Sequence, residues 1–431
     1  MATRARGSAP QLTTPSWWTR MWSPFWAVPV ACAVAALALA VLLPLVDRRL
    51  TEYLPVFFHG GPDGARSVLT TIATAMISVT GLVFSITMVV LQLASSQFTP
   101  RVLGSFLDSR VTQVTLGVFV ATFVFALTVL RSVVGDSVPG SQRYVPTLSV
   151  STAFVLVLAS VGMFLAFIHH ITTSIQVTTV VSRLADATVD LVDQHFPQDE
   201  SSRSAIPPTW SPGPQDERAT LPVVDRYGYV VAIDFDRLIR AATAAGVVLV
   251  LERGLGDYLV EGQPLATTWR APGQQPDGAQ QDEADLDLAS QVSGAFLVGG
   301  QPSMRQDVTF GVRQLVDIAE RALSPGINDP TTAVQVLNEL HRVLRIVVTR
   351  DPTSAYVSDD DAVVRVVHRQ PTSGDLVRLS TEEIAHWGRD SVQIPRRLIE
   401  LFDDLQAAAS ERNSSELARV RSQVLEIVGQ R

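Results

Sequence analysis

The sequence contains no lysine, so arginine supplies all 34 of its basic side chains. This absence excludes the lysine-containing phosphate loop of many nucleotide-binding proteins, the lysine Schiff base of pyridoxal enzymes, and lysine-linked biotin or lipoyl arms. Cysteine is almost absent too, because Cys32 is the single one. A disulfide framework and a thiolate metal site of the usual spacing are therefore excluded. We expect no cofactor, no metal site and no enzymatic activity.

Charge is also scarce over the first part of the chain. The long apolar runs lie before Ile171, and most of the residues behind the formal net charge of −8 follow it. A nucleic-acid partner requires a clustered basic surface, so we expect none. With 431 residues, 47% of them hydrophobic, the chain has room for a membrane bundle and one or two water-soluble domains.

One apolar stretch organises this membrane part. No charged residue occurs between Arg66 and Arg101, and a spanning helix needs only about 20 apolar residues. A helix from Ser67 to Leu93 would measure roughly 40 Å against a hydrocarbon core of about 30 Å, so it must tilt or project from the bilayer. The stretch therefore predicts a transmembrane helix.

Small and polar residues recur along this helix at alternating spacings of three and four, which places them on one face. The candidate residues are Thr71, Thr74, Ser78, Gly81, Ser85 and Gln92, with Met88 among them. One interpretation is close helix packing within the bundle, as is common in membranes. The other is a water-filled passage lined by several copies of the chain. We favour packing on general grounds, and the lack of acids or arginines within the spans disfavours a proton relay or voltage sensor.

Three further apolar runs predict spans on either side of this helix, so the four spans cover residues 25–46, 67–93, 111–130 and 146–168. Thr99-Pro100 has the form of a helix start, and a short helix from there to Arg110 has one apolar side that suits the membrane surface. Four spans place both termini on one side. The loops and tail next to the spans carry five arginines on each side of the membrane. The preference of arginine for the cytoplasmic side therefore does not decide the orientation. Because the N-terminal tail is basic without acids, we predict both termini in the cytoplasm of a bacterial cell and a multi-pass protein of its inner membrane.

The composition predicts an α-helical membrane protein with four transmembrane helices, followed by a soluble mixed α/β, mainly helical C-terminal region. Each predicted region differs from its neighbours in charge or in proline and glycine content. They are a basic tail (1–24), the transmembrane domain (25–170), an amphipathic helix and Pro/Ser-rich linker (171–222), a β-rich subdomain (223–270), an acidic linker (271–285) and a helical α/β region (286–431).

Local patterns predict the elements of the soluble part. YGYVVAIDF and GVVLVLERG read as strands separated by a short helix, and VVRVVHR reads as a third strand. Helices are predicted over Ile171–Phe196, Leu286–Gly300, Ser303–Leu323, from Asp329-Pro330 to Thr349, and from about Gln393 and Ser415. Ser380-Thr381-Glu382-Glu383 has the form of a capping box.

Two soluble segments carry polar patterns of interest. Arg313, Asp317 and Arg321 stand at successive i,i+4 positions before a turn. They read as ordinary ion pairs on a helix face, or as guanidinium groups that hold an anion near a helix N-terminus. The segment Gly256–Ala266 is similar to a turn of lipoyl-like barrels, with no lysine to carry a prosthetic group. Its two glycines, Gly256 and Gly262, are predicted to adopt positive φ.

Several motifs together resemble a bacterial predicted membrane protein family of unknown function (domain of unknown function 2254). The resemblance covers most of the chain, from about Phe25 to the C-terminal helices, and implies four spans and a soluble C-terminal region. It implies no reaction, substrate or catalytic residue. The motifs are SVTGLVFSITMVVLQLASSQFTPRVL, FIHHITTSIQV, QDVTFGVRQLVDIAERALSPGINDPTTA and YGYVVAIDF.

These observations favour a homo-oligomeric membrane protein in the lipid bilayer, a channel or transport-like pore gated by its soluble region. The alternative is a membrane-anchored scaffold or sensor without a permeation path. A membrane enzyme comes third, because no nucleophile, metal set or cofactor fingerprint is present.

Overall fold

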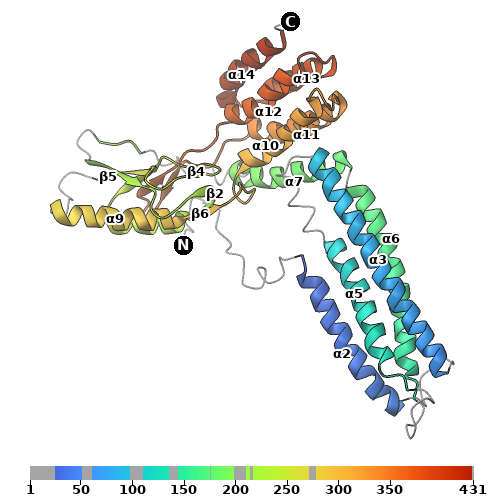
Figure 1. The fold of residues 1–431 in the computed structure, drawn as a ribbon. Coiled ribbons are helices and arrows are strands. Elements are labelled where there is room, and N and C mark those ends of the chain that lie inside the picture. Colours follow the sequence, from blue (N-terminus) through green and yellow to red (C-terminus); the bar gives the residue numbers. More distant parts are fainter. Residues whose placement is uncertain are drawn as a thin grey trace, which may run out of the picture. The chain divides into compact units, whose positions relative to one another are not determined.

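The computed structural model describes residues 25–50, 61–97, 110–134, 144–174, 176–198, 210–213, 217–270 and 278–429. The chain divides into two compact units, one ending at Thr179 and the other beginning at Val180. The basic tail and the predicted surface helix before Arg110 lie outside the described residues. Figure 1 shows long helices in the first unit and mixed strands and helices in the second.

Within the described residues, four helices of the first unit are long and apolar enough to cross a membrane, which confirms the predicted number of spans. They are α2 (Ala27–Leu50), α3 (Pro62–Gln97), α5 (Arg110–Leu130) and α6 (Thr147–Ser174). The predicted start of α3 at Ser67 is too late. Pro62 begins the helix instead, because proline suits the first turn and Asp63 complements the positive end of the helix dipole.

The helix α5 is the most buried of the four. It packs against α2, α3 and α6, and small or hydroxyl-bearing side chains occupy these contacts. A Cβ atom at Gly117 would lie 2.9 Å from Cys32 Sγ of α2. Thr122 Oγ1 of α5 lies 3.1 Å from Ser160 Oγ of α6. Close packing through small residues and interhelical hydroxyl bonds is how membrane helices commonly associate.

The described strands of the second unit form two sheets. The larger one has the strand order β1 (Glu217–Pro222), β5 (Pro264–Arg270), β3 (Val248–Leu251), β8 (Val364–Val367) and β7 (Tyr356–Ser358). Only the β3 and β8 pair is parallel. The smaller sheet has the order β4 (Tyr258–Leu259), β2 (Gly228–Ile233) and β6 (Phe296–Gly299), all antiparallel. Strands from the β-rich subdomain and from the C-terminal region thus meet in one sheet.

The predicted strand, helix, strand order is confirmed as β2, α8 (Phe235–Ala245) and β3, although β2 and β3 belong to different sheets. The prediction of one helix over residues 286–300 is wrong at its end. The helix α9 (Gly278–Ala295) begins inside the predicted acidic linker, and β6 follows it directly. Phe296 is buried in the core between α8, α9 and the sheets, which explains the change to a strand.

Helices form the rest of this unit, namely α7 (Val177–His195), α10 (Val308–Leu323), α11 (Pro330–Thr349), α12 (Ser373–Gly388), α13 (Gln393–Ala408) and α14 (Glu411–Gly429). The helix predicted over Ser303–Leu323 is observed as α10, and its apolar residues, which recur at helical spacing, are buried from Val308 to Leu323. One continuous helix from Ile171 to Phe196 is wrong. The helix α6 runs to Ser174, and α7 starts separately at Val177.

Helix starts follow local capping chemistry. Asp329 caps α11 by accepting from Thr332 N at 3.1 Å, with Pro330 in the first turn as predicted. The predicted capping box at Ser380 is wrong, because Ser380 lies buried inside α12 and bonds to Leu376 O. The actual box is formed by Thr372 and Asp375, each of which accepts from the backbone N–H of the other.

Candidate functional site

The predicted polar face of α3 lies on the surface of the first unit, which is called the four-helix unit below. All six candidate residues and Met88 are exposed, namely Thr71, Thr74, Ser78, Gly81, Ser85 and Gln92. The opposite face of α3 supplies the buried residues Ala65, Leu69, Ile72, Ala73, Met76, Val83 and Val90. Among the described residues, the polar face therefore takes no part in the packing of the four helices.

Hydroxyl groups on this face bond to their own helix. Thr71 donates to Ser67 O at 2.8 Å, Ser78 to Thr74 O at 2.9 Å and Ser85 to Gly81 O at 2.9 Å. Such bonds reduce the free-energy cost of placing a hydroxyl in hydrocarbon. A Cβ atom at Gly81 would meet no atom within 4 Å. On this face, the three hydroxyl hydrogens are therefore bonded within the helix, and the surface at Gly81 is open.

The second candidate cluster is an ion-pair network on α10. Arg313 donates to Asp317 at 2.7 Å and to Glu320 at 3.0 Å, and it also pairs with Glu383 of α12. Arg321 lies further along the same helix. Three carboxylates already surround the Arg313 guanidinium, so an added anion would meet negative charge. Glu320 lies on the same helix as Arg313, at a spacing that places the two side chains on one face. Glu383 is 70 positions from Arg313, so no helical spacing in the sequence indicates this contact.

Two carboxyl groups of this network, Glu320 and Glu383, interact through a hydrogen bond that shifts both of their pKa values. Burial and a hydrogen bond with Glu383 raise the pKa of Glu320 to about 7. The pKa of Glu383 is lowered, chiefly by the hydrogen bond from Glu320 and also by Arg313. Like charges close to each other disfavour double ionisation, which is why the pKa values of the two groups move in opposite directions.

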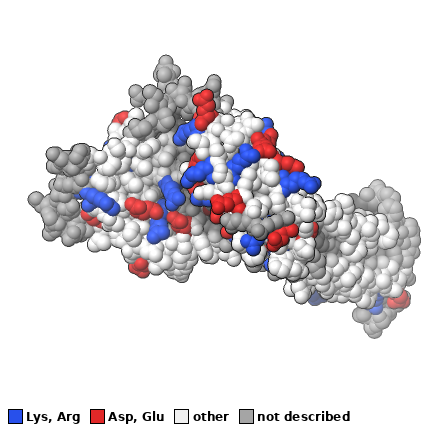
Figure 2. Space-filling view, turned by 90° about the horizontal axis from the view of Figure 1, so that it is seen from above, with Lys and Arg blue, Asp and Glu red and all other residues white. Residues whose placement is uncertain are grey.

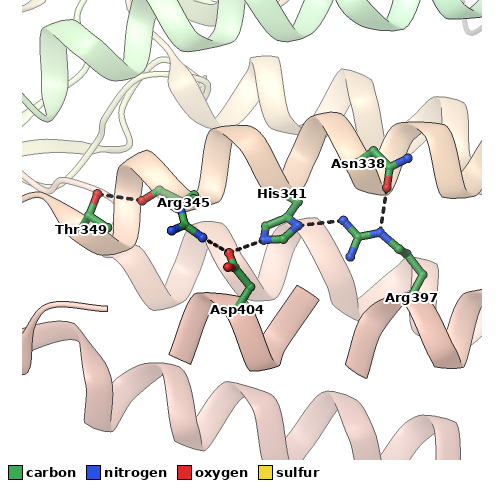
Figure 3. A network of polar contacts seen from close by, with 6 residues as sticks. All are labelled: Asn338, His341, Arg345, Thr349, Arg397 and Asp404. Atoms are coloured by element: carbon green, nitrogen blue, oxygen red, sulfur yellow. Dashed lines mark hydrogen bonds and ion pairs between the residues drawn. The ribbon is translucent and has the colours of Figure 1, made fainter. Parts of the chain in front are cut away.

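Figure 3 shows a further polar network, on α11 and α13. His341 Nε2 lies 2.8 Å from Asp404 Oδ2, and Arg397 donates to His341 Nδ1 at 2.7 Å. A guanidinium group can only donate, so Nδ1 is the acceptor of this contact and Nε2 faces the Asp404 carboxylate. Arg345 completes the pairing with Asp404. These polar contacts connect α11 to α13.

A cavity of about 490 Å³ lies within the second unit. Its walls come from the C-terminal end of α7, the junction of β2 and α8, the loop after β3, the start of α10, the β7 region, the residues after β8 and the first turns of α12. Volumes of this size are typical of small-molecule sites. No sequence pattern pointed to it, because seven separate segments build its walls.

Two titratable groups of this cavity, Asp307 and His368, have pKa values that burial shifts. Asp307 is 7% exposed and caps α10, with Phe310 N donating to Oδ1 at 3.1 Å. Burial raises the pKa of Asp307, and bonds from Phe310 and Thr309 and the charge of His195 oppose that rise. Burial lowers the pKa of His368 to about 4, so this ring is neutral at neutral pH.

Among the residues that the structure describes, no three histidine, cysteine, aspartate or glutamate side chains gather as metal ligands. Figure 2 shows blue and red side chains mixed over the second unit, whereas the four-helix unit at the right is nearly white. The surface of the four-helix unit exposes apolar side chains such as Leu165 and Phe154 instead. This distribution suits one unit in lipid and one in water.

A family model described as "Predicted membrane protein (DUF2254)" matches residues 22–404. Uncharacterised proteins of Mycobacterium tuberculosis and Mycobacterium bovis are each 33% identical over 328 residues, which is 75% of this chain and 60% of the relative. The chain thus spans about 60% of the length of these curated relatives. No solved structure matches it.

Proposed function

We propose, from the premise that the chain belongs to the predicted membrane protein family DUF2254, that it is a membrane-anchored sensor whose soluble unit binds a small ligand. The observation that carries this proposal is the cavity of about 490 Å³, with the end of α7 in its wall. The cavity favours the sensor alternative over the channel. The proposed role is binding rather than catalysis.

The helix α7 supplies a physical route from the cavity to the membrane. Gln194 and His195 at its C-terminal end line the cavity. Its N-terminal end at Val177 follows the last membrane helix after only two residues. A rigid helix transmits a displacement along its length, so a ligand that favours one position of α7 shifts the equilibrium of the attached span.

The proposal places the protein in the bacterial inner membrane, with both termini in the cytoplasm and the cavity facing cytoplasmic solutes. It also takes the working form to be a homo-oligomer. The exposed polar face of α3 supports self-association, because it is rich in small residues, which let membrane helices approach closely.

Hydrogen–deuterium exchange of the full-length protein in detergent micelles tests the sensor function. A fragment library containing cations, anions and neutral molecules is first screened by thermal shift. A fragment that protects residues 252–257 and 306–309 of the cavity wall is expected to alter exchange in residues 171–180 as well. A response confined to the cavity wall, or no protecting fragment, would contradict the proposal.

Two substitutions on α12 provide a matched control. Leu379 lines the cavity and His386 is exposed elsewhere on the same helix. Leu379→Trp is expected to fill the cavity and abolish both the protection and the exchange change. His386→Trp is expected to retain both. Overpacking of this kind costs about 1–3 kcal/mol, which a folded unit of this size tolerates.

The second candidate function is a pore formed by several copies, and the exposed polar face of α3 favours it. After Cys32→Ala, single cysteines at Ser78, Gly81 and Ser85 would react with a charged thiol reagent only where water reaches them. Cysteine at the exposed Leu82 is the lipid-facing control, and cysteine at the buried Val83 is the packing control. Labelling restricted to the polar face, with altered ion flux, would favour the pore. Unreactive cysteines that form cross-links between copies would favour helix packing in an oligomer.

A further inference from the structure

Carboxylates are concentrated on one wall of the cavity. Asp257 accepts from Gly254 N at 2.8 Å, and Glu252 accepts from Thr267 Oγ1 at 2.8 Å. Asp307 lies directly against this loop, since a Cβ atom at Gly256 would be 2.7 Å from Asp307 Oδ2. A carboxylate has about four acceptor positions, so each group retains capacity for a ligand donor.

The charges of the whole lining are also predominantly negative. Six carboxylates but only two guanidinium groups line the cavity, namely Glu252, Asp257, Asp307, Asp375, Glu382 and Glu383 against Arg369 and Arg378. Arg378 is already paired with Asp375 at 2.8 Å, and Glu383 is paired with Arg313 of α10. Four carboxylates then remain in the described lining against one guanidinium group, that of Arg369. The lining therefore attracts cations and repels anions.

Helix N-termini would be the natural anion sites here, but the three that reach the cavity, those of α8, α10 and α12, are already capped. Asp234 accepts from Arg237 N in the first turn of α8, and Asp307 accepts from the first turn of α10. Thr372 and Asp375 form the capping box of α12. The positive ends of the three helix dipoles are thus compensated by the chain's own groups, which disfavours phosphate or carboxylate ligands.

Aromatic rings line the same cavity. The rings of Phe235 and His368 lie with centroids 4.8 Å apart, and Tyr356 also contributes to the lining. Because burial keeps His368 neutral, its ring adds no positive charge. Aromatic faces attract ammonium and guanidinium groups through the ring quadrupole, and they pack against apolar bodies.

From the acidic wall, the capped helix ends and the aromatic rings, we infer that the cavity binds an organic cation, an ammonium or guanidinium group carried on a small apolar body. The cation lies against Asp307 and Asp257, and the apolar body contacts Phe235 and Tyr356. This inference rests on the proposed sensor function for its biological role, but the choice of ligand class is tested separately.

Three indole compounds of similar size and different charge provide the probes. Tryptamine is a cation at neutral pH, tryptophol is its neutral alcohol, and indole-3-acetate is an anion. Isothermal titration of the full-length protein in micelles is expected to give binding of tryptamine at least about tenfold tighter than tryptophol, the effect of one charge-assisted hydrogen bond. Indole-3-acetate is expected to bind more weakly than either.

Asp307→Asn is the decisive variant, because asparagine caps helices as well as aspartate and preserves the fold. It is expected to remove the preference for tryptamine over tryptophol. Asp390→Asn, at a side chain that is 88% exposed, is the matched control and is expected to retain the preference. No measurable tryptamine binding at millimolar concentration, equal or tighter binding of either other probe, or a preference that survives Asp307→Asn would overturn the inference.

The outcomes for ligand class and for sensing are distinguishable. If tryptophol or indole-3-acetate binds best and alters exchange in residues 171–180, the cation assignment fails and the sensor function stands. If tryptamine binds with the expected preference and residues 171–180 do not respond, the ligand class stands and the sensor function fails.

Discussion

Gly256 and Gly262 have nearly the same backbone conformation, with φ of +80° and +81°. Both values confirm the predicted positive φ. Their surroundings differ, because a Cβ atom at Gly256 would be 2.7 Å from Asp307 Oδ2, whereas one at Gly262 would meet nothing within 4 Å. Backbone strain is therefore common to both positions, and a steric conflict is present at only one.

Alanine at these two positions separates strain from steric conflict. Gly262→Ala is expected to lower the free energy of unfolding by about 1–2 kcal/mol through left-handed strain alone. Gly256→Ala is expected to cost more, because it must also displace the Asp307 carboxylate. Chemical unfolding of the full-length protein, followed by tryptophan fluorescence, measures both. Equal losses would mean that Asp307 moves aside freely.

The raised pKa of Glu320 predicts a pH dependence of stability. In the folded protein the pKa of Glu320 is raised to about 7 from its ordinary value of 4.5. The folded state therefore binds more protons between these values, and this group's contribution to stability is lost as pH rises through the window. The pKa of His368 is lowered to about 4 from its ordinary value of 6.5. Its contribution to stability therefore rises with pH between these two values, opposite to that of Glu320. Each variant is compared with wild type for this reason.

Glu320→Gln is expected to remove the loss of stability between about pH 5 and 7, relative to wild type. Melting temperatures across this range provide the measurement. Glu339→Gln on α11 is the control, because Glu339 pairs with Arg342 and lies outside the network. A Glu320→Gln curve that runs parallel to wild type would show that Glu320 is ionised throughout.

At the scale of elements, two arginines connect α7 to other helices of the second unit, and their side chains differ in exposure. Arg350 has a side chain that is 14% exposed, and it donates to Asp193 at 2.6 Å and to Phe196 O at 3.1 Å. Arg342 pairs with Asp186 at 2.7 Å, but both side chains are largely exposed. A buried donor to a carbonyl matters more than a solvated ion pair.

Arg350→Ala is expected to destabilise the α7 attachment by about 1–3 kcal/mol, because it leaves polar partners unpaired. Arg342→Ala is expected to change it by less than about 1 kcal/mol. Hydrogen exchange of residues 177–196 reports the local stability of this helix. Similar exchange in the two variants would place the main attachment in the backbone bond from Thr353 N to His195 O.

At the scale of the whole molecule, four spans require both ends of the membrane domain to lie on one side. A reporter that is active only in the cytoplasm is expected to be active after Arg431 and inactive when inserted near Gly61. A reporter active only outside the cytoplasm should give the complementary pattern. The reverse result for both would invert the orientation and leave the four spans unchanged.

The sequence by itself determined those features that depend on local physics. Four uncharged apolar runs specify four spans, since the transfer of each run into lipid depends on its own composition. Asp329 and Pro330 specify a helix start, and the buried stripe of α10 follows from its spacing. Each of these features involves residues within a few turns of one another.

Only the tertiary structure decided where distant segments meet. The strand β8 pairs with β3 in parallel although more than one hundred residues separate them. Glu383 reaches Arg313 from another helix, and the cavity is closed by segments from α7 to α12. The outward direction of the α3 polar face also depended on which side packs against α5. Such contacts arise from the burial of nonlocal surfaces, which leaves no periodic signal in the chain.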